Sequence, residues 1–335
     1  MICCDRLIKE FLPHFKPVLY AFLVALILSV LSGCAYIQLG PSIGPLEEVT
    51  LEGEGDEKIL LLEIEGVIGN KAKRSLTGFS IDVGMVEKVR EILKQASEDD
   101  AIRGLLVRIN SPGGTVTSSD IIFHELQRFK QERNIPVYVA IVDLAASGGY
   151  YIAQAGDLIM AHPTSLIGSI GVIAMKVNLT ELMGKVGVDW EIVKSGDKKD
   201  FLSPFRALTE EERRLFQDTI DQFHDRFVRL IADNRPELSY DQALIIADGR
   251  VYTAEQALGN KLIDKIAYFD EMTEHMKTHL GVDALKIVTY QRSGDFKSNL
   301  YSQADRIPPT VNLFNIDIGM DWLPSTPQFM YLWAP

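Results

Sequence analysis

Residues 137–153, VYVAIVDLAASGGYYIA, decide the fold, because an apolar strand over 137–142 leads through a turn of small residues into a helix. A serine at such a junction places its hydroxyl at the positive end of a helix, among backbone N–H groups that lack partners. The small neighbours of Ser147 leave room for a peptide carbonyl group. The turn alone is also compatible with close packing, and it differs from the G-x-S-x-G turn of α/β-hydrolases.

A second glycine-rich turn precedes the first. Residues 110–114, NSPGG, follow an expected strand over 104–109, and paired glycines permit backbone conformations that other residues avoid. We expect the N–H groups of Gly114 and Gly148 to face one carbonyl oxygen, as an oxyanion hole requires. The alternative is a plain turn between a strand and a helix.

Short apolar strands and helices alternate around these turns, which is typical of an α/β domain. The other expected segments are strands at 59–64, near 170–175 and at 191–193, and helices at 83–97 and after Thr117. A long helix should begin at Thr209, where Thr209 and Glu212 form a capping box. Its apolar stripe should face the core or another subunit and contains Phe216, Ile220, Phe223, Phe227 and Leu230.

The composition excludes several functions. A net charge of −12 argues against a nucleic-acid partner, because phosphate binding needs clustered Lys and Arg. Cysteines occur only at Cys3, Cys4 and Cys34, so the body can hold neither a disulfide nor a thiolate zinc site. We expect no metal and no cofactor, and the sequence has no phosphate-binding loop for ATP.

The N-terminal segment predicts membrane attachment. Residues 18–37 carry no charged side chain and follow three basic residues, which is typical of a spanning helix or of a secretory signal. Residues 31–34, LSGC, resemble the lipobox of bacterial lipoproteins, in which Cys34 would be lipidated. Both alternatives stay open, and both place the body on the extracytoplasmic side of a bacterial membrane.

We therefore divide the chain into a signal or anchor segment (1–37), a linker (38–57), one catalytic domain (58–290) and a C-terminal tail (291–335). The tail lacks periodicity and contains five prolines, yet it keeps many apolar side chains. We expect it to dock on a surface groove, on this subunit or a neighbouring one, through Phe314, Trp322, Leu323, Phe329, Tyr331 and Trp333.

A serine nucleophile needs a base. Among the six histidines, His162 is the one candidate worth testing. The loop at 195–204, SGDKKDFLSP, offers Lys198 and Lys199, and burial can make a lysine a general base because it disfavours the ammonium. The residues alone leave histidine and lysine open.

Seven motifs occur in one order: NSPGG (110–114), ASGGYYIA (146–153), GSIGV (168–172), KSG (194–196), KD (199–200), SP (203–204) and GRVYT (249–253). Together, over about residues 58–290, they resemble the short form of bacterial signal peptide peptidase A. The resemblance implies the α/β fold of the ClpP/crotonase type, in which repeated ββα units coil into a superhelix. It also implies a homo-oligomeric ring or dome at a membrane that cleaves remnant signal peptides and other short or unfolded peptides.

The same resemblance implies a role for each matching residue. Ser147 is the nucleophile, Lys199 the general base, and Ser169 orients the lysine, while the oxyanion donors are Gly114 and Gly148. Lys198 competes with Lys199, but the family pattern places the base just before the aspartate. His162 stands where relatives usually carry asparagine, and it remains the alternative base.

Two other functions would share this fold. One is a scaffold without activity, and the other is an acyl-CoA hydratase or isomerase of the crotonase type. Neither needs a serine paired with a lysine, and this chain keeps Ser147, Ser169 and Lys199 together.

Overall fold

The computed structural model describes residues 44–70, 73–74, 81–282, 284–292, 295–296, 305–306 and 329–333. The predicted anchor segment (1–37), including Cys34, lies outside these residues. Within the described part of the chain, no helix combines the length and the apolar character needed to cross a membrane.

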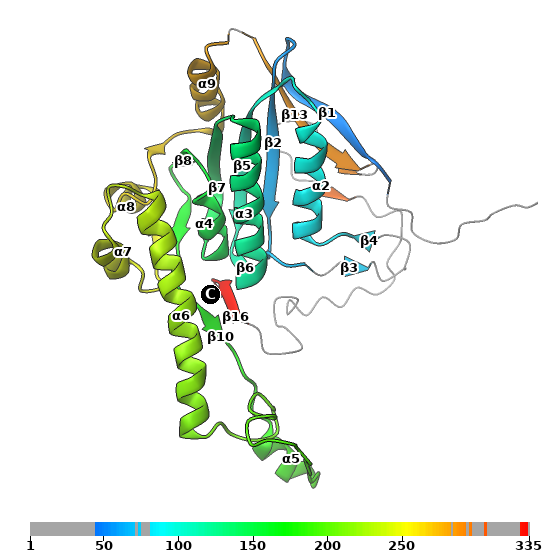
Figure 1. The fold of residues 1–335 in the computed structure, drawn as a ribbon, viewed down its shortest axis with the longest axis vertical. Coiled ribbons are helices and arrows are strands. Elements are labelled where there is room, and N and C mark those ends of the chain that lie inside the picture. The colour runs from blue at the N-terminus through cyan, green and yellow to red at the C-terminus, as the bar shows by residue number, and fades with distance from the viewer. Residues whose placement is uncertain are drawn as a thin grey trace, which may run out of the picture. The chain divides into compact units, whose positions relative to one another are not determined.

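A nine-stranded sheet forms the centre of the body (Figure 1). Its main order is β1-β13-β2-β5-β7-β8-β12, and β9 joins β7 to β11. The strands are β1 (Leu46–Gly53), β2 (Lys58–Glu65), β5 (Ile102–Ser111), β7 (Val137–Ala146), β8 (Leu158–Ala161), β9 (Leu166–Gly168), β11 (Val251–Thr253), β12 (Lys265–Ile266) and β13 (Lys286–Arg292). The central strands β2, β5 and β7 are parallel, so the turns after β5 and β7 lie at one edge of the sheet.

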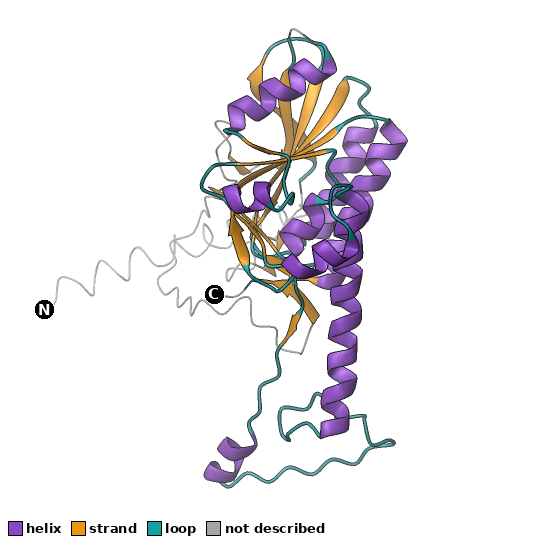
Figure 2. Ribbon diagram, turned by 90° about the vertical axis from the view of Figure 1, so that its left-hand side faces the viewer, coloured by secondary structure: helices purple, strands orange, loops and turns teal. Residues whose placement is uncertain are grey.

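Helices cover both faces of the sheet (Figure 2). On β2, Leu60 and Leu62 point into the larger core, whereas Ile59 and Leu61 point into a second core built with α9. This strict alternation follows from the period of two in a strand. The described helices are α2 (Met85–Ser97), α3 (Val116–Arg133), α4 (Gly148–Ala153), α5 (Thr180–Val186), α6 (Glu210–Asn234), α7 (Tyr240–Ile246), α8 (Ala254–Gly259) and α9 (Phe269–Leu280).

Most of the expected elements are present, and three expectations are corrected. The helix after Thr209 begins with the predicted capping box. Residues 191–193 form no strand, and of 170–175 only β10 (Ile173–Ala174) is extended into a sheet. The predicted linker (38–57) contains β1, whose half-buried Leu46, Val49 and Leu51 pack while its acidic residues face outward.

Residues 175–209, which we call the arm, leave the body after β10 and lie beside the N-terminal part of α6 (Figure 2). The arm carries α5 and a long loop. Many of the apolar side chains of the arm are exposed: Val177, Leu182, Val186, Val188, Trp190 and Val193.

The end of the tail forms a strand in a second, three-stranded sheet. Its order is β10-β16-β6, where β6 is Gly113–Thr115 and β16 is Phe329–Leu332. β16 is antiparallel to β6, with Tyr331 opposite Gly114 and Leu332 opposite Gly113. The predicted docking therefore occurs at 329–332, on the same chain, while Phe314, Trp322 and Leu323 lie outside the described residues. Two short strand pairs, β3 (Lys73–Arg74) with β4 (Ile81–Asp82) and β14 (Asp295–Phe296) with β15 (Asp305–Arg306), complete the described elements.

Candidate active site

Ser147 lies at the junction between β7 and α4, where the sequence predicts it. Its backbone has φ 53° and ψ −114°, a conformation that non-glycine residues adopt only when their surroundings enforce it. The constraint comes from both sides, since the Ser147 N–H donates to Gly168 O at 2.7 Å and the Tyr151 N–H donates to Ser147 O at 2.9 Å. The side chain is 1% exposed, and its hydroxyl lies 3.4 Å from Gly171 O.

The two glycine-rich turns meet beside Ser147. A methyl group added to Gly113 would lie 2.7 Å from the Gly148 nitrogen, so the two backbones are in contact. Ser111 holds this turn, because its hydroxyl donates to Gly66 O at 2.6 Å and accepts from the Gly113 N–H at 3.1 Å. Close approach of this kind is possible only without side chains.

A peptide carbonyl already lies against this glycine surface. The carbonyl oxygen of Tyr331 is so close to Gly113 that an added methyl group would overlap it, and it would be 3.1 Å from a methyl on Gly148. Gly114, one of the two predicted donors, faces Tyr331 in the β6–β16 register. Gly113 and Gly148 thus lie against one carbonyl group, here supplied by the tail, and the donor roles of Gly114 and Gly148 stay a prediction.

The side chain of Tyr331 fills an aromatic pocket. It is fully buried and stacks on Tyr151 with ring centroids 5.1 Å apart, and Phe227 lies 4.8 Å from Tyr331 and 5.1 Å from Tyr151, so the three rings form one cluster. Its hydroxyl donates to Phe223 O at 2.8 Å. Burial raises the pKa of Tyr331, so the phenol stays neutral and serves as a donor. The pocket accepts a large, flat side chain with one polar end.

Ser169 lies close to Ser147 through the pairing of β7 with β9. Its backbone is left-handed, with φ 48°, and its N–H donates to Arg250 O at 2.7 Å. The side chain is 7% exposed. Within the described residues its hydroxyl forms no hydrogen bond, so it is available to a group that comes from outside this part of the chain.

Lys199 is not beside Ser147. It lies on the arm, in a loop whose residues contact the first turns of α6: Phe201 contacts Phe216, and Lys198 forms an ion pair with Glu211. The body contacts α6 from Phe216, on which Phe329 of β16 packs at 5.2 Å, as far as Phe227, which packs against Tyr151 of α4. Along α6, the positions of Glu211 and Phe227 differ by about 24 Å at the usual rise per residue.

Within one chain, the structure therefore does not bring Lys199 to Ser147. The arm carries Lys199 away from the body, and its side chain is exposed. Among the described residues its ammonium has no hydrogen bond and no ion pair. One chain holds the nucleophile, the glycine turns and Ser169 together, and it holds the predicted base apart from them.

His162 is also separate from Ser147. Its Nδ1 lies 2.9 Å from the Thr164 hydroxyl, and its ring packs edge-on against Tyr268 at 4.9 Å. Its backbone N–H donates to Ile141 O, on β7 well before the serine. The structure gives His162 no contact with Ser147, so it offers no support for a serine–histidine pair within the chain.

Two features were not predicted from the sequence: the turn residues beside Gly148 and an arginine of the arm. Gly113 and Ser111 shape the turn beside Gly148, although both belong to the quoted NSPGG motif. No sequence pattern indicates that Arg206 of the arm binds two carboxylates, because its partners are known only once the loop is folded.

Comparison with known proteins identifies the family of this chain. Residues 129–283 match Peptidase family S49, and residues 71–167 match the Clp protease family. A protein of Enterococcus faecium named "Putative signal peptide peptidase SppA" is 35% identical over 245 residues, which are 73% of this chain and 70% of that protein. "Probable protease SohB" of Haemophilus influenzae is 32% identical over 229 residues, 68% of this chain and 60% of the relative.

"Protease 4" of Haemophilus influenzae is 31% identical over 216 residues, which are 64% of this chain and 33% of that protein. The matches and the parallel sheet confirm the predicted α/β fold of the ClpP/crotonase type. The chain belongs to peptidase family S49, in the group of signal peptide peptidase A, and it is a serine-type peptidase that acts on peptides.

Proposed function

We propose that this peptidase is a membrane-anchored endopeptidase that cleaves remnant signal peptides and other short or unfolded peptides with a Ser147 nucleophile and a Lys199 base. The observation that carries the proposal is β16. It lies as an added strand along β6, with the Tyr331 carbonyl against the glycines beside Ser147. Strand addition is a general way to bind an extended peptide. A substrate bound in this way would take the place of this strand.

The chemistry proposed is acyl transfer. The neutral amine of Lys199 takes the proton of the Ser147 hydroxyl as its oxygen attacks the carbonyl carbon of the substrate. The oxyanion accepts hydrogen bonds from the N–H groups of Gly114 and Gly148. Lys199 then gives the proton to the leaving amine, and water hydrolyses the acyl-serine by the same base.

A second copy of the chain supplies the base in this proposal. Ser147 and Lys199 are apart in one chain, and the arm exposes apolar side chains such as Val193, which is 95% exposed. Exposed apolar patches mark surfaces that bind other proteins. Seating the arm on a neighbour would remove Lys199 from water, which favours the neutral amine. The hydroxyl of Ser169 has no partner in the described residues. It can then accept a hydrogen bond from that amine or donate one to it.

The lysines of the arm differ in a way that favours Lys199. Lys194 donates to Asp200 at 2.8 Å, and Lys198 forms its ion pair with Glu211. A carboxylate partner stabilises the charged ammonium and opposes its use as a base. Of these three lysines, Lys199 is the one without a carboxylate partner among the described residues.

Subunit complementation tests the proposal. Full-length Ser147→Ala and Lys199→Ala chains should each lose peptidase activity by about 1000-fold or more in a fluorogenic peptide assay. Co-expressed with two different affinity tags and purified through both, the mixed assembly should regain activity, because an intact serine of one chain meets an intact lysine of the other. His162→Ala should remain active. A fully active Lys199→Ala protein would contradict the assignment of the base.

The membrane anchor rests on residues 1–37, and mass spectrometry of the protein purified from membranes tests it. A lipidated Cys34 at the mature N-terminus would identify a lipoprotein, and an intact segment 18–37 would identify an uncleaved anchor. A mature protein that lacks both would contradict membrane anchoring. The substrate class is tested with synthetic signal peptides, which should be cleaved in preference to folded proteins.

A further inference from the structure

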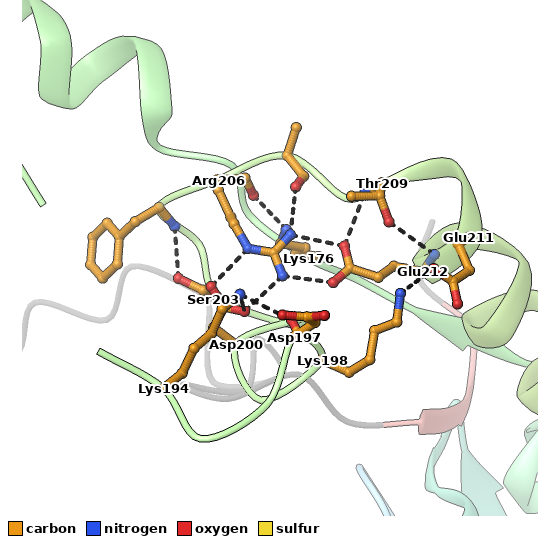
Figure 3. Close-up of polar contacts among 12 residues, drawn as sticks. Lys176, Lys194, Asp197, Lys198, Asp200, Ser203, Arg206, Thr209, Glu211 and Glu212 are labelled. Atoms are coloured by element: carbon orange, nitrogen blue, oxygen red, sulfur yellow. Dashed lines mark hydrogen bonds and ion pairs between the residues drawn. The ribbon is translucent and has the colours of Figure 1, made fainter. Parts of the chain in front are cut away.

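We propose that Arg206 is a positioning residue for the reaction, which fixes the Lys199 loop on the N-terminal turn of α6. The inference rests on the proposed role of Lys199 as base. Arg206 lies between two carboxylates, one from the loop that carries Lys199 and one from the helix (Figure 3). No other arginine on the arm can take this place, because Arg206 is the one arginine in residues 175–209.

Arg206 binds both carboxylates in a forked geometry. Towards Asp200 its Nε and Nη2 donate at 2.8 and 2.9 Å, and towards Glu212 its Nη1 and Nη2 donate at 2.8 and 2.7 Å. Nη1 also donates to Ala207 O at 3.0 Å. Two-pronged pairs of this kind fix orientation as well as distance, which a point charge cannot do.

Both carboxylates are shielded from water and depend on this cation. The side chains of Glu212 and Asp200 are 2% and 10% exposed. Hydrogen bonds from Arg206 lower the pKa of Asp200, and with the Thr209 N–H they lower the pKa of Glu212 to about 2. Without Arg206, Glu212 would keep the Thr209 N–H and Asp200 would keep Lys194, and the link from Asp200 to the helix would be lost. The Lys198–Glu211 ion pair and the Phe201–Phe216 contact would then be the contacts left between loop and helix.

The link bears directly on Lys199 because Asp200 is its covalent neighbour. Lys199 itself is held only through its backbone, whose N–H donates to Gly196 O at 3.1 Å. The position of its amine relative to α6 therefore depends on its two covalent neighbours: Lys198, which pairs with Glu211, and Asp200, which is held through Arg206. On the far side, Lys176 donates to Arg206 O at 2.6 Å, which ties the start of the arm to the same point.

This role differs from general support of the fold. The described side-chain and carbonyl partners of Arg206 all lie within residues 176–212. The body that holds Ser147 and the aromatic pocket receives no contact from it there. Loss of Arg206 should therefore leave substrate binding in place and move the base.

Kinetics of the full-length Arg206→Gln protein make the first test. We expect kcat for a fluorogenic peptide to fall by about 100-fold with KM nearly unchanged, because a small misplacement of a catalytic group has an effect of this size. Arg206→Lys should recover little, since one ammonium cannot form both forks. The matched control is Arg213→Gln on α6. The side chain of Arg213 is exposed and forms a single 3.7 Å ion pair with Glu210. Its kcat should stay unchanged.

Mixed assemblies make the second test, which a merely structural role would not pass. Arg206→Gln is placed either on the Ser147→Ala chain, which supplies Lys199, or on the Lys199→Ala chain, which supplies Ser147. We expect the first mixture to lose the restored activity by about 100-fold and the second to keep it. Size-exclusion chromatography and thermal melting should show the same assembly and folding in both.

Each outcome of these two tests either supports or overturns the role of Arg206. Equal activity in the two mixtures, or an unchanged kcat of the Arg206→Gln protein, would overturn the role of Arg206. If the mixture without any Arg206 substitution stays inactive, the base is not supplied by a second copy, and the proposed assembly of the site fails. In that case, a comparison of the kcat values of Arg206→Gln and Arg213→Gln still decides whether Arg206 positions the lysine.

Discussion

The turn that carries Ser147 and the loop that carries Lys199 are built in opposite ways. The turn is closed by backbone hydrogen bonds and buried between β7, β9 and α4, and its serine is 1% exposed. The loop lies on an arm whose apolar side chains face outward and whose order comes from ion pairs around Arg206. The Ser147 turn has its packing partners within the chain, whereas the Lys199 loop lies on an arm that leaves apolar side chains exposed.

This difference separates folding from activity. The nucleophile and the glycine surface are set by the same packing that stabilises the body, so each chain presents them as soon as it folds. In the proposed mechanism, Lys199 becomes available as a base only when the arm is covered. A peptidase built in this way would stay inactive as a free chain, because an exposed ammonium cannot accept a proton.

In the turns of the body, the largest effect is expected from Gly113→Ala. The added methyl group would lie 2.7 Å from the Gly148 nitrogen and overlap the place of the Tyr331 carbonyl oxygen. We expect kcat/KM to fall by about 100-fold or more, as on removal of an oxyanion donor. Steady-state assays of the purified full-length protein measure the fall.

Gly281→Ala is the control for backbone strain. Gly281 also has a positive φ, 67°, at the end of α9, but a methyl group there would meet nothing within 4 Å. It should destabilise the fold by about 1 kcal/mol and leave kcat/KM unchanged. If the two variants lose the same activity, crowding beside Gly148 is not the cause.

The body could be predicted well from the sequence. Alternation in β2, the capping box at Thr209 and the two glycine turns are local patterns with strong physical causes, and each lies where it was expected. Ser147 follows from its place between an apolar strand and a helix. The fold class follows from the same segments together with the family resemblance.

The arm and the tail could not be predicted in the same way. Residues 191–193 have the composition of a strand, but no neighbouring strand is near them on the arm, so they stay irregular. The separation of Lys199 from Ser147 depends on the length of α6 and on where the arm leaves it, which no local pattern encodes. The pairing of β16 with β6 joins distant segments, and only the aromatic content of the tail indicated it.

A smaller effect, on stability, should come from Tyr331→Ala. The side chain is fully buried between Tyr151 and Phe227, so its loss leaves a cavity. We expect the free energy of unfolding to fall by about 3 kcal/mol, measured by chemical denaturation. Tyr331→Phe removes only the hydrogen bond to Phe223 O and should lower it by about 1 kcal/mol.

An exposed aromatic residue of the body gives the comparison. Tyr268 is 52% exposed and packs edge-on against His162. Tyr268→Ala should change the free energy of unfolding by less than about 1 kcal/mol. A loss as large as that of Tyr331→Ala would mean that burial in the aromatic pocket does not stabilise the tail.

The smallest effect is a pH-dependent opening of the arm. Arg206 and the Thr209 N–H lower the pKa of Glu212 from 4.5 to about 2, and Arg206 and Lys194 lower the pKa of Asp200 below 3.8. A carboxylate with a lowered pKa stabilises the folded arm above its unfolded pKa. This stabilisation is lost as the pH falls from about 4.5 towards 2.

Trp190 reports on this opening because its ring packs on Phe205 of the arm at 4.2 Å. In a Trp322→Phe/Trp333→Phe background its fluorescence should change between about pH 4 and pH 2, before the far-UV circular dichroism of the body does. Arg206→Gln should move the midpoint upward, towards 4.5, because the carboxylates regain their ordinary affinity for protons. A midpoint that does not move in this variant would show that ion pairs around Arg206 do not hold the arm, and that its order has another source.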